Sequence, residues 1–217
     1  MAGTLIAFEG IDGSGLSTHS RLLAEALKAV GCKSVYTKEP TDGPVGQIIR
    51  SQLSSASPDA VLMALLFAAD RAWHLLSDPT LPGRGGVIGA LEAGYVVVTD
   101  RYKYSSIAYQ GTAGAPLEWL WEVNSFAREA DMVVYIDVPV EVAMARVQER
   151  GRREAYERAG FLSSVKMTFE GVLEEATRRG VRVLRVKGIE GGAVRPIEEV
   201  SREIVERVMK SLNGCGP

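Results

Sequence analysis

The amino-acid sequence predicts an α/β fold in which a five-stranded, mostly parallel sheet is covered by helices on both faces. Short apolar runs alternate with longer segments whose apolar residues recur every three to four positions. The short runs are apolar at nearly every position, which is typical of strands buried on both faces. The chain has 217 residues, of which 46% are hydrophobic, so residues 1–217 are expected to form one domain with a sizeable core.

The N-terminal third of the chain predicts two strands and three helices. Leu5–Phe8 is an apolar run that ends in a glycine-rich turn, and the segment after it has leucines and alanines on one helical face. Gly31 is a typical stop for that helix. The expected elements are a strand at Leu5–Phe8, a helix at Ser17–Val30, a strand at Ser34–Tyr36 and helices at Val45–Leu53 and Asp59–Leu76.

The remaining two thirds continue the alternation. Tyr95–Thr99 contains three consecutive valines and is the third strand, and Ser77–Gly86 before it is rich in proline and glycine and is expected to be a loop. The later elements are a helix at Pro116–Glu129, a strand at Met132–Asp137, a helix at Val140–Arg150, a helix over much of Phe161–Arg179, a strand at Val181–Val186 and a helix at Pro196–Leu212. Strands separated by helices indicate a parallel sheet, because parallel neighbours need crossover connections.

The charge and hydropathy of the chain exclude several classes of protein. The formal net charge is -2, whereas a protein with a broad nucleic-acid-binding face usually carries excess positive charge. No apolar run reaches the roughly 18 residues of a membrane span, and Met1–Phe8 is too short for a signal peptide. We therefore expect a cytoplasmic protein without nucleic-acid or membrane partners, whose phosphate chemistry concerns a small ligand.

A glycine-rich loop between the first strand and the first helix is the strongest functional signal. Its residues are Gly10, Ile11, Asp12, Gly13, Ser14, Gly15, Leu16, Ser17 and Thr18. This context is that of a phosphate-binding P-loop, whose glycines let successive N–H groups face an anion at the positive end of a helix. We expect the loop to bind a nucleoside triphosphate, with Ser17 as a Mg²⁺ ligand, in a P-loop three-layer α/β/α fold.

Position 16 departs from the P-loop pattern, because it holds leucine where the motif has lysine. The motif's lysine reaches the β- and γ-phosphates, and leucine supplies neither charge nor donor. Losing one such contact costs about 3–4 kcal/mol, or roughly a hundred- to a thousandfold in rate, when nothing replaces it. The backbone of the loop survives the change, so the sequence supports nucleotide binding more strongly than catalysis.

Further motifs make the resemblance to a known family specific. They are Lys38-Glu39-Pro40, Phe67-Ala68-Ala69-Asp70-Arg71, Thr99-Asp100-Arg101-Tyr102 and Tyr109-Gln110-Gly111. The Asp-Arg pair falls at the carboxyl end of a central strand, where open α/β sheets bind their ligands. Together with the glycine-rich loop, these motifs resemble thymidylate kinase over nearly the whole chain.

The resemblance implies roles in transferring a phosphoryl group from ATP to dTMP with Mg²⁺. It implies that Phe67 stacks on thymine, that Arg71 and Ser106 meet the base, and that Tyr109 crowds the 2′ side of the sugar. Further residues implied at the dTMP site are Asp12, Lys38, Glu39, Pro40, Arg50, Arg101, Ser105 and Gln110. Asp100 resembles the acid associated with Mg²⁺, and Asp12, Asp100 and Arg101 are the implied catalytic residues. In isolation, each of these side chains would more often be a core or ion-pair residue than a ligand contact.

A charged segment follows the helix after the fourth strand. The resemblance implies a lid at about 147–160 and a contact of Arg146 with adenine. Because position 14 is serine, the chain is similar to the branch whose catalytic arginine lies in the lid. We expect Arg150, Arg152 or Arg153 to supply the charge that Leu16 lacks, with Lys38 and Lys103 as weaker candidates. Taken alone, the charge run would be a solvated helix end.

Two other functions stay open alongside phosphorylation of dTMP to dTDP. One is a monophosphate kinase with relaxed or shifted base specificity, which the small Ser106 contact would permit. The other is a catalytically impaired nucleotide-binding protein, which the missing lysine would explain. The family also implies a homodimer, and the apolar helices predicted at 59–76 and 116–129 are compatible with one.

Overall fold

The computed structural model describes residues 3–54, 58–149 and 155–212, of which residues 155–158 are described by their backbone alone. The strands are β1 (Thr4–Glu9), β2 (Ser34–Lys38), β3 (Val96–Asp100), β4 (Met132–Asp137), β5 (Arg182–Lys187), β6 (Ile189–Glu190) and β7 (Ala193–Val194). The helices are α1 (Leu16–Ala29), α2 (Pro44–Leu53), α3 (Ala60–Leu76), α4 (Gly86–Glu92), α5 (Lys103–Thr112), α6 (Leu117–Val123), α7 (Val140–Glu149), α8 (Ala155–Arg178) and α9 (Ile197–Met209).

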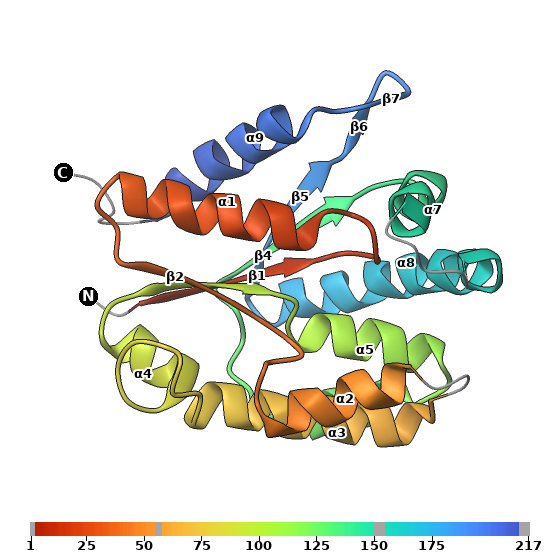
Figure 1. Cartoon of the computed structure of the whole chain (residues 1–217), viewed down its shortest axis with the longest axis horizontal. Coiled ribbons are helices and arrows are strands. Elements are labelled where there is room, and N and C mark those ends of the chain that lie inside the picture. Colours follow the sequence, from red (N-terminus) through yellow and green to blue (C-terminus); the bar gives the residue numbers. More distant parts are fainter. Residues whose placement is uncertain (1–2, 55–57, 150–154, 213–217) are drawn as a thin grey trace.

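Strands β1 to β5 form one parallel sheet of five strands, as predicted, and their order in the sheet is β2-β3-β1-β4-β5. Helices α1 and α9 cover one face, and α4, α5 and α8 cover the other, with α2 and α3 farther out (Figure 1). Every residue of β3 is buried, which agrees with its run of valines. The three-layer architecture predicted from the alternating pattern is therefore confirmed.

The sheet register brings the carboxyl ends of three strands together. Asp100 of β3 pairs with Phe8 of β1 on one side and with Lys38 of β2 on the other. The chain that leaves β1 enters α1, and the ends of these strands point toward α7 (Figure 1). Residues that follow β1, β2 and β3 in the sequence therefore meet at one edge of the sheet.

Helix α5 is the main element that the sequence pattern did not predict. Its residues include serine, tyrosine, glycine and threonine, which are weak helix formers. Six successive residues, 103–108, are buried, so the helix has no polar face that would produce an amphipathic period. Packing against α3 and α8 stabilises it instead.

Three smaller differences concern the ends of elements. The helix expected at Pro116–Glu129 ends at Val123, because the next residue, Asn124, is buried and its side chain donates to Leu120 O. Helix α4 follows the expected loop, and β6 and β7 form a short antiparallel hairpin that the sequence pattern did not predict. No helix within the described segments has the length and apolarity needed to cross a membrane.

Candidate functional site

The glycine-rich loop joins β1 to α1 and leaves its backbone amides at the N-terminus of α1. Gly13 has φ of +85°, and a Cβ there would lie 2.2 Å from Ala143 O, so this turn requires glycine. Ser17 Oγ donates to Asp100 Oδ2 at 2.5 Å. The Ser14 hydroxyl is buried and has no hydrogen-bond partner among the described residues. The loop thus presents backbone donors and one unused hydroxyl to an anion.

Leu16 turns into the protein interior. Its side chain is only 5% exposed and belongs to the hydrophobic core. The leucine is therefore accommodated by packing, and the loop keeps its backbone form without the motif's lysine.

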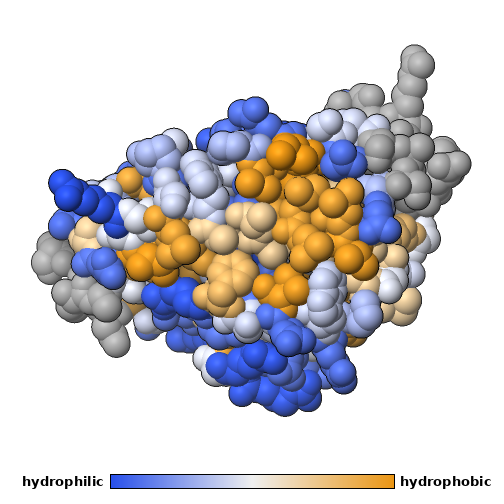
Figure 2. Space-filling model, turned by 90° about the horizontal axis from the view of Figure 1, so that it is seen from below, coloured by the Kyte–Doolittle hydropathy of each residue, from blue (hydrophilic) through white to orange (hydrophobic). Residues whose placement is uncertain are grey.

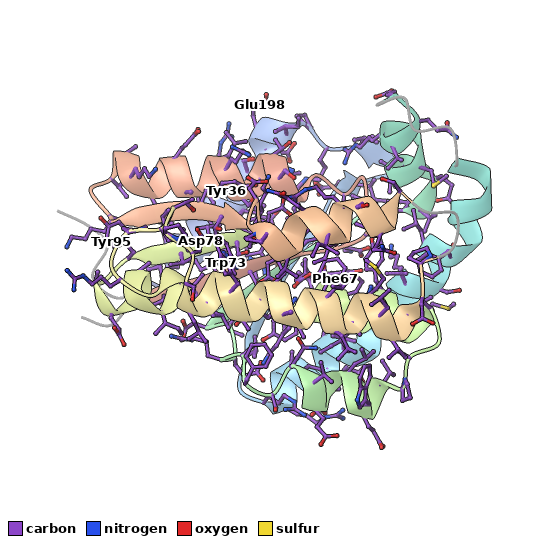
Figure 3. The ribbon with its side chains drawn as sticks, turned by 60° about the horizontal axis from the view of Figure 1, so that its bottom comes forward. Tyr36, Phe67, Trp73, Asp78, Tyr95 and Glu198 are labelled. Atoms are coloured by element: carbon purple, nitrogen blue, oxygen red, sulfur yellow. The ribbon has the colours of Figure 1, made fainter. Side chains whose placement is uncertain are left out.

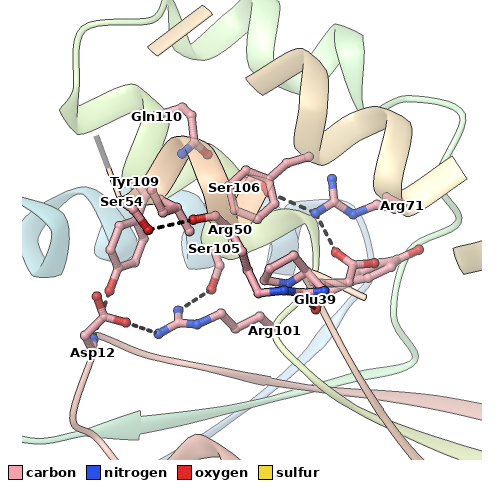
Figure 4. A pocket seen from close by; sticks show the side chains of 14 residues that line it. Asp12, Glu39, Arg50, Ser54, Arg71, Arg101, Ser105, Ser106, Tyr109 and Gln110 are labelled. Atoms are coloured by element: carbon pink, nitrogen blue, oxygen red, sulfur yellow. Dashed lines mark hydrogen bonds and ion pairs between the residues drawn. The ribbon is translucent and has the colours of Figure 1, made fainter. Parts of the chain in front are cut away.

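Two cavities meet at this loop. The first, called here the loop cavity, has a volume of about 490 Å³ and is lined by residues 11–18 together with Lys38, Glu39, Pro40, Arg50, Asp100, Arg101 and Val147. The second, called here the large cavity, has a volume of about 720 Å³ and is lined by Asp12, Glu39, Pro40, Arg50, Leu53, Ser54, Phe67, Arg71, Arg101, Tyr102, Ser105, Ser106, Tyr109 and Gln110 (Figure 4).

The large cavity collects residues that are far apart in the sequence. All the side chains predicted for the dTMP site line it except Lys38, which lines the loop cavity. Phe67 reaches it from α3, the helix that runs across the front of Figure 3. The two cavities share Asp12, Glu39, Pro40, Arg50 and Arg101, so a ligand in one would adjoin a ligand in the other at these residues.

Arg101 is held at the junction of the two cavities. Its guanidinium contacts Asp12 Oδ1 at 2.8 Å and Ser105 Oγ at 2.9 Å (Figure 4). It also donates to Gly10 O at 3.0 Å. It is a non-glycine residue with φ of +70°, a costly backbone conformation for a residue with a side chain. Burial alone would lower the pKa of Arg101, but Tyr109 and Asp12 raise it above its ordinary value.

Glu9, at the end of β1, supports the backbone around Arg101. Its carboxylate accepts the Tyr102 amide at 3.0 Å and the Ser105 hydroxyl, and it is completely buried. Burial raises the pKa of Glu9 to about 8, although the Ser105 contact opposes the shift. The sequence indicated no role for Glu9, whose only signal was its place immediately before the loop.

Arg71 is the centre of a second polar network, on the far side of the large cavity. Its side chain is 0% exposed and donates to Glu39 Oε2 at 2.6 Å, to Ser106 Oγ at 2.9 Å and to Asn124 Oδ1. Its Nε atom is buried without a partner among the described residues. The arginine is thus fixed by three neighbours and keeps one donor unused.

His74 and Thr37 extend this network behind Glu39. His74 Nδ1 lies 3.0 Å from Glu39 Oε1, and its Nε2 lies 2.7 Å from Thr37 Oγ1. Burial would raise the pKa of Glu39, but Arg71 and His74 lower it below its ordinary value. Asn124, His74 and Thr37 carried no sequence signal, because their relation to Arg71 exists only in the folded chain.

Tyr109 and Arg50 fix the remaining walls. The Tyr109 hydroxyl accepts the Asp12 amide at 2.9 Å, and its ring lies 5.3 Å from the Arg101 guanidinium. Arg50 donates to Thr41 O at 2.7 Å and to Pro40 O at 3.3 Å. These contacts tie α5 to the loop and α2 to the segment that follows β2.

A third, smaller cavity lies on the other side of the loop. It has a volume of about 260 Å³ and is lined in part by Ser14, Gly15 and Arg146. Arg146 NH1 donates to Gly13 O at 3.2 Å. His19 lies beside it, where burial lowers its pKa to about 4 and its Nδ1 is 2.7 Å from Ser201 Oγ. The position of Arg146 is compatible with the predicted contact to a nucleotide base.

The predicted replacements for the loop lysine are separated by the structure. Lys103 is buried and bonded to Glu129 and Ala127 O, away from the loop cavity, so it is excluded from that role. Lys38 lines the loop cavity. Arg150, Arg152 and Arg153, and most of the predicted lid at 147–160, lie outside the residues with described side chains.

A divalent cation would find oxygen ligands at the loop. The described residues hold no group of three histidine, cysteine or acidic side chains suited to a metal on its own. Ser17 Oγ and Asp100 Oδ2, however, lie together in the loop cavity, and Mg²⁺ prefers such oxygen donors completed by substrate phosphates and water. The residues therefore fit Mg²⁺.

Comparison with known proteins agrees with this site. The family model described as "Thymidylate kinase" matches residues 8–204. A provisionally named thymidylate kinase of Aeropyrum pernix is 53% identical over 213 residues, covering 96% of this chain and 97% of its own length. One of Pyrococcus abyssi, also named provisionally, is 36% identical over 221 residues, covering 99% and 100%. With the loop, the Asp-Arg pair and both cavities in place along the matched residues, the chain belongs to the thymidylate kinase family.

Proposed function

We propose that the protein transfers the γ-phosphoryl group of ATP to dTMP, giving ADP and dTDP. The observation that carries the proposal is the meeting of the loop cavity and the large cavity at Asp12 and Arg101. Phosphoryl transfer needs two anionic substrates held in line with their charge neutralised. Cavities that adjoin at one fixed guanidinium satisfy that requirement, and the family relationship makes the nucleotide pair specific.

The large cavity is the proposed dTMP site. Its aromatic wall at Phe67 suits a flat pyrimidine, and the unused Nε donor of Arg71 lies at its polar end. Arg101 would grip the acceptor phosphate with a planar fork, assisted by Arg50. Tyr109, held by the Asp12 amide, would crowd the 2′ side of the sugar. No side chain acts as a covalent nucleophile, because a phosphate oxygen of dTMP attacks the γ-phosphorus directly.

The loop cavity is the proposed site of the ATP phosphates. The backbone amides of residues 13–18 and the buried Ser14 hydroxyl would hold the phosphate oxygens. Ser17 and Asp100 would hold Mg²⁺, which supplies charge neutralisation and orients the phosphates when bound. The small cavity at Arg146 would take the adenine, and the segment at 147–160, with Arg150, Arg152 and Arg153, is proposed to close over the donor.

A turnover assay tests the proposal. ADP release is measured with ATP, Mg²⁺ and each of several monophosphates, with dTMP expected to give the highest kcat/KM. Comparable rates with dUMP and other monophosphates would identify a kinase of relaxed specificity instead. Binding of ATP and dTMP without turnover would contradict the proposal.

The leucine at position 16 supports a second candidate function, that of a nucleotide-binding protein that has lost catalytic activity. The Leu16→Lys variant separates the two functions. In a kinase, the unmodified protein turns over and the lysine changes the rate modestly. Activity that appears only with the lysine would identify the binding protein.

We also propose a homodimer formed through the face that contains α3. Apolar side chains gather on the surface seen from below the view of Figure 1 (Figure 2). Leu62 and Leu65 of α3 are 44% and 49% exposed, and Leu117 of α6 is 46% exposed. Exposed apolar patches of this kind mark association surfaces. Sedimentation velocity should show a dimer that Leu65→Arg converts to a monomer, whereas Leu22→Arg on α1, across the sheet, leaves it intact.

A further inference from the structure

The loop cavity contains few cations that could contact an ATP phosphate in place of the missing lysine. Among the described residues that line it, the positively charged side chains are Lys38, Arg50 and Arg101. Leu16 is packed in the core and cannot contribute. To replace the lysine, a side chain must lie in the loop cavity and must not be held by other strong contacts.

Two of these cations already have fixed partners. Arg101 is held by Asp12, Gly10 O and Ser105, and it faces both cavities. Arg50 donates to two backbone carbonyls, and it also lines both cavities. Moving either side chain toward the donor phosphates would break bonds that shape the large cavity. Neither is therefore suited to replace the lysine.

Lys38 differs from them in both respects. It lines the loop cavity and not the large cavity. Its ion pair with Asp42, at 3.0 Å, is the contact that the structure gives its ammonium group. The side chains of this pair are 40% and 75% exposed, and such exposed pairs contribute about 0–1 kcal/mol. A polyphosphate with several negative charges would compete with this single carboxylate for the ammonium group.

The sheet brings Lys38 to the same edge as the loop. It is the last residue of β2 and pairs in register with Asp100 of β3, whose carboxylate accepts the Ser17 hydroxyl. The four-carbon stem of a lysine allows its ammonium group to move several ångströms without any shift of the backbone. The positive charge that the loop lacks at position 16 is thus available from Lys38 on β2, which lies two strands away from β1 in the sheet.

We propose that Lys38 replaces the missing P-loop lysine. Its ammonium group would move away from Asp42 and contact the β- and γ-phosphates of the donor. This inference rests on the proposed kinase function and changes the assignment of Lys38 from the dTMP site to the donor site. It accounts for a loop that keeps its backbone, its serine and its magnesium ligands while position 16 is apolar. Lys38 then neutralises charge on the transferred group.

The first test separates binding of the two nucleotides. Lys38→Met removes the charge and keeps the length of the side chain, and Lys28→Met, an exposed lysine at the end of α1, is the matched control. We expect Lys38→Met to lower kcat roughly a hundredfold and to weaken ATP binding about tenfold, while dTMP affinity by calorimetry stays unchanged. Lys38→Arg should restore most of the rate.

The second test uses the motif itself. If Lys38 replaces the loop lysine, adding Leu16→Lys to Lys38→Met should recover at least about tenfold in kcat, more than it adds to the unmodified protein. If Lys38 had only a structural role, a lysine at position 16 would not restore the kcat of Lys38→Met. Because Leu16 is buried, thermal unfolding is measured for each variant, and a misfolded Leu16→Lys leaves the decision to the first test.

Two results would overturn the inference. Equal rates and ATP affinities for Lys38→Met and Lys28→Met would place the compensating charge elsewhere, such as Arg150, Arg152 or Arg153. Weaker dTMP binding with normal ATP binding would return Lys38 to the acceptor site. Failure of the proposed kinase function is distinguishable from failure of this inference. An unmodified protein without turnover would contradict the kinase function, and the ATP affinities of the variants would still test the role of Lys38.

Discussion

The large cavity and the loop cavity are built in different ways. Arg71 of the large cavity is buried and bonded to Glu39 and Asn124, which are also buried and come from two other segments of the chain. The loop cavity is formed largely by the contiguous residues 11–18, and its other lining residues include Lys38, whose partner Asp42 is exposed. The large cavity is therefore preorganised by tertiary packing, whereas the loop cavity combines a local backbone form with a lysine whose ion pair is exposed. The following variants test this contrast, from the largest expected effect to the smallest.

Replacing Arg71 should affect the protein most. Arg71→Met leaves Glu39 buried without its cation, which costs about 3–5 kcal/mol in the free energy of unfolding. Urea unfolding measures this loss, and calorimetry should show that dTMP binding is lost as well. The double variant with Glu39→Gln should regain stability but not dTMP binding. A single variant as stable as the unmodified protein would contradict a preorganised network.

Replacing Arg101 should affect catalysis more than folding. Its pair with Asp12 is partly exposed, at 21% and 43%, so Arg101→Ala should unfold close to the unmodified protein. Loss of its contact to the acceptor phosphate should lower kcat/KM for dTMP by about 10²- to 10³-fold. Steady-state kinetics measures the ratio, and a decrease of less than tenfold would remove Arg101 from the proposed mechanism.

Glu9 should make stability depend on pH. Its pKa is about 8 in the folded protein and near 4.5 in the unfolded chain, so the folded state holds its proton more tightly. The free energy of unfolding therefore falls as pH rises through this window, by up to about 1.4 kcal/mol per unit. His19, with a pKa lowered to about 4, acts in the opposite sense between about 4 and 6.5.

The comparison between the unmodified protein and Glu9→Gln is thus cleanest between pH 6.5 and 8, where His19 contributes little. The glutamine variant should show a smaller decrease in the free energy of unfolding over this range, measured in urea at each pH. Parallel curves for the two proteins would show that Glu9 is already ionised in the folded state.

The smallest change is expected at Asp42. Asp42→Asn removes two exposed ion pairs, with Lys38 and with Arg50, so the free energy of unfolding should change by less than about 1 kcal/mol, in contrast with the buried Arg71 pair. The pKa of Asp42 is lowered by its bond to Lys38, so any loss should disappear at acidic pH. A loss as large as that of Arg71→Met would show that the loop cavity is as preorganised as the large one.

The fold was predicted correctly wherever the pattern of apolar residues in a segment indicates how that segment is buried. Three consecutive valines in β3 and the apolar residues of β1 show burial on both faces, and the parallel order followed from the alternation with helices. Helix α5 escaped prediction because burial on all sides erases helical periodicity. The early end of α6 escaped it because Asn124 is engaged by Arg71, from a distant part of the chain.

The residues of the candidate site also divide into those that the sequence indicated and those that only the folded structure shows. Motif residues such as Asp12, Arg101 and Tyr109 were found from the sequence, since each stands at a fixed distance from a strand end or a glycine. Glu9, His74 and Asn124 were missed, because their only link to the motifs is a hydrogen bond across the fold. Lys38 was also found from the sequence, and it lines the loop cavity rather than the large cavity that holds the other residues predicted for the dTMP site.

The sequence by itself determined the three-layer architecture, the glycine-rich loop and the family, because burial patterns and backbone requirements are written in contiguous residues. Only the tertiary structure decided which side chains share a cavity. It separated Lys103 from the loop and set Lys38 beside it, since the register of β2 against β3 and the burial of Lys103 are properties of the packed chain. Charges act through space, and the distances between them exist only once the sheet has formed.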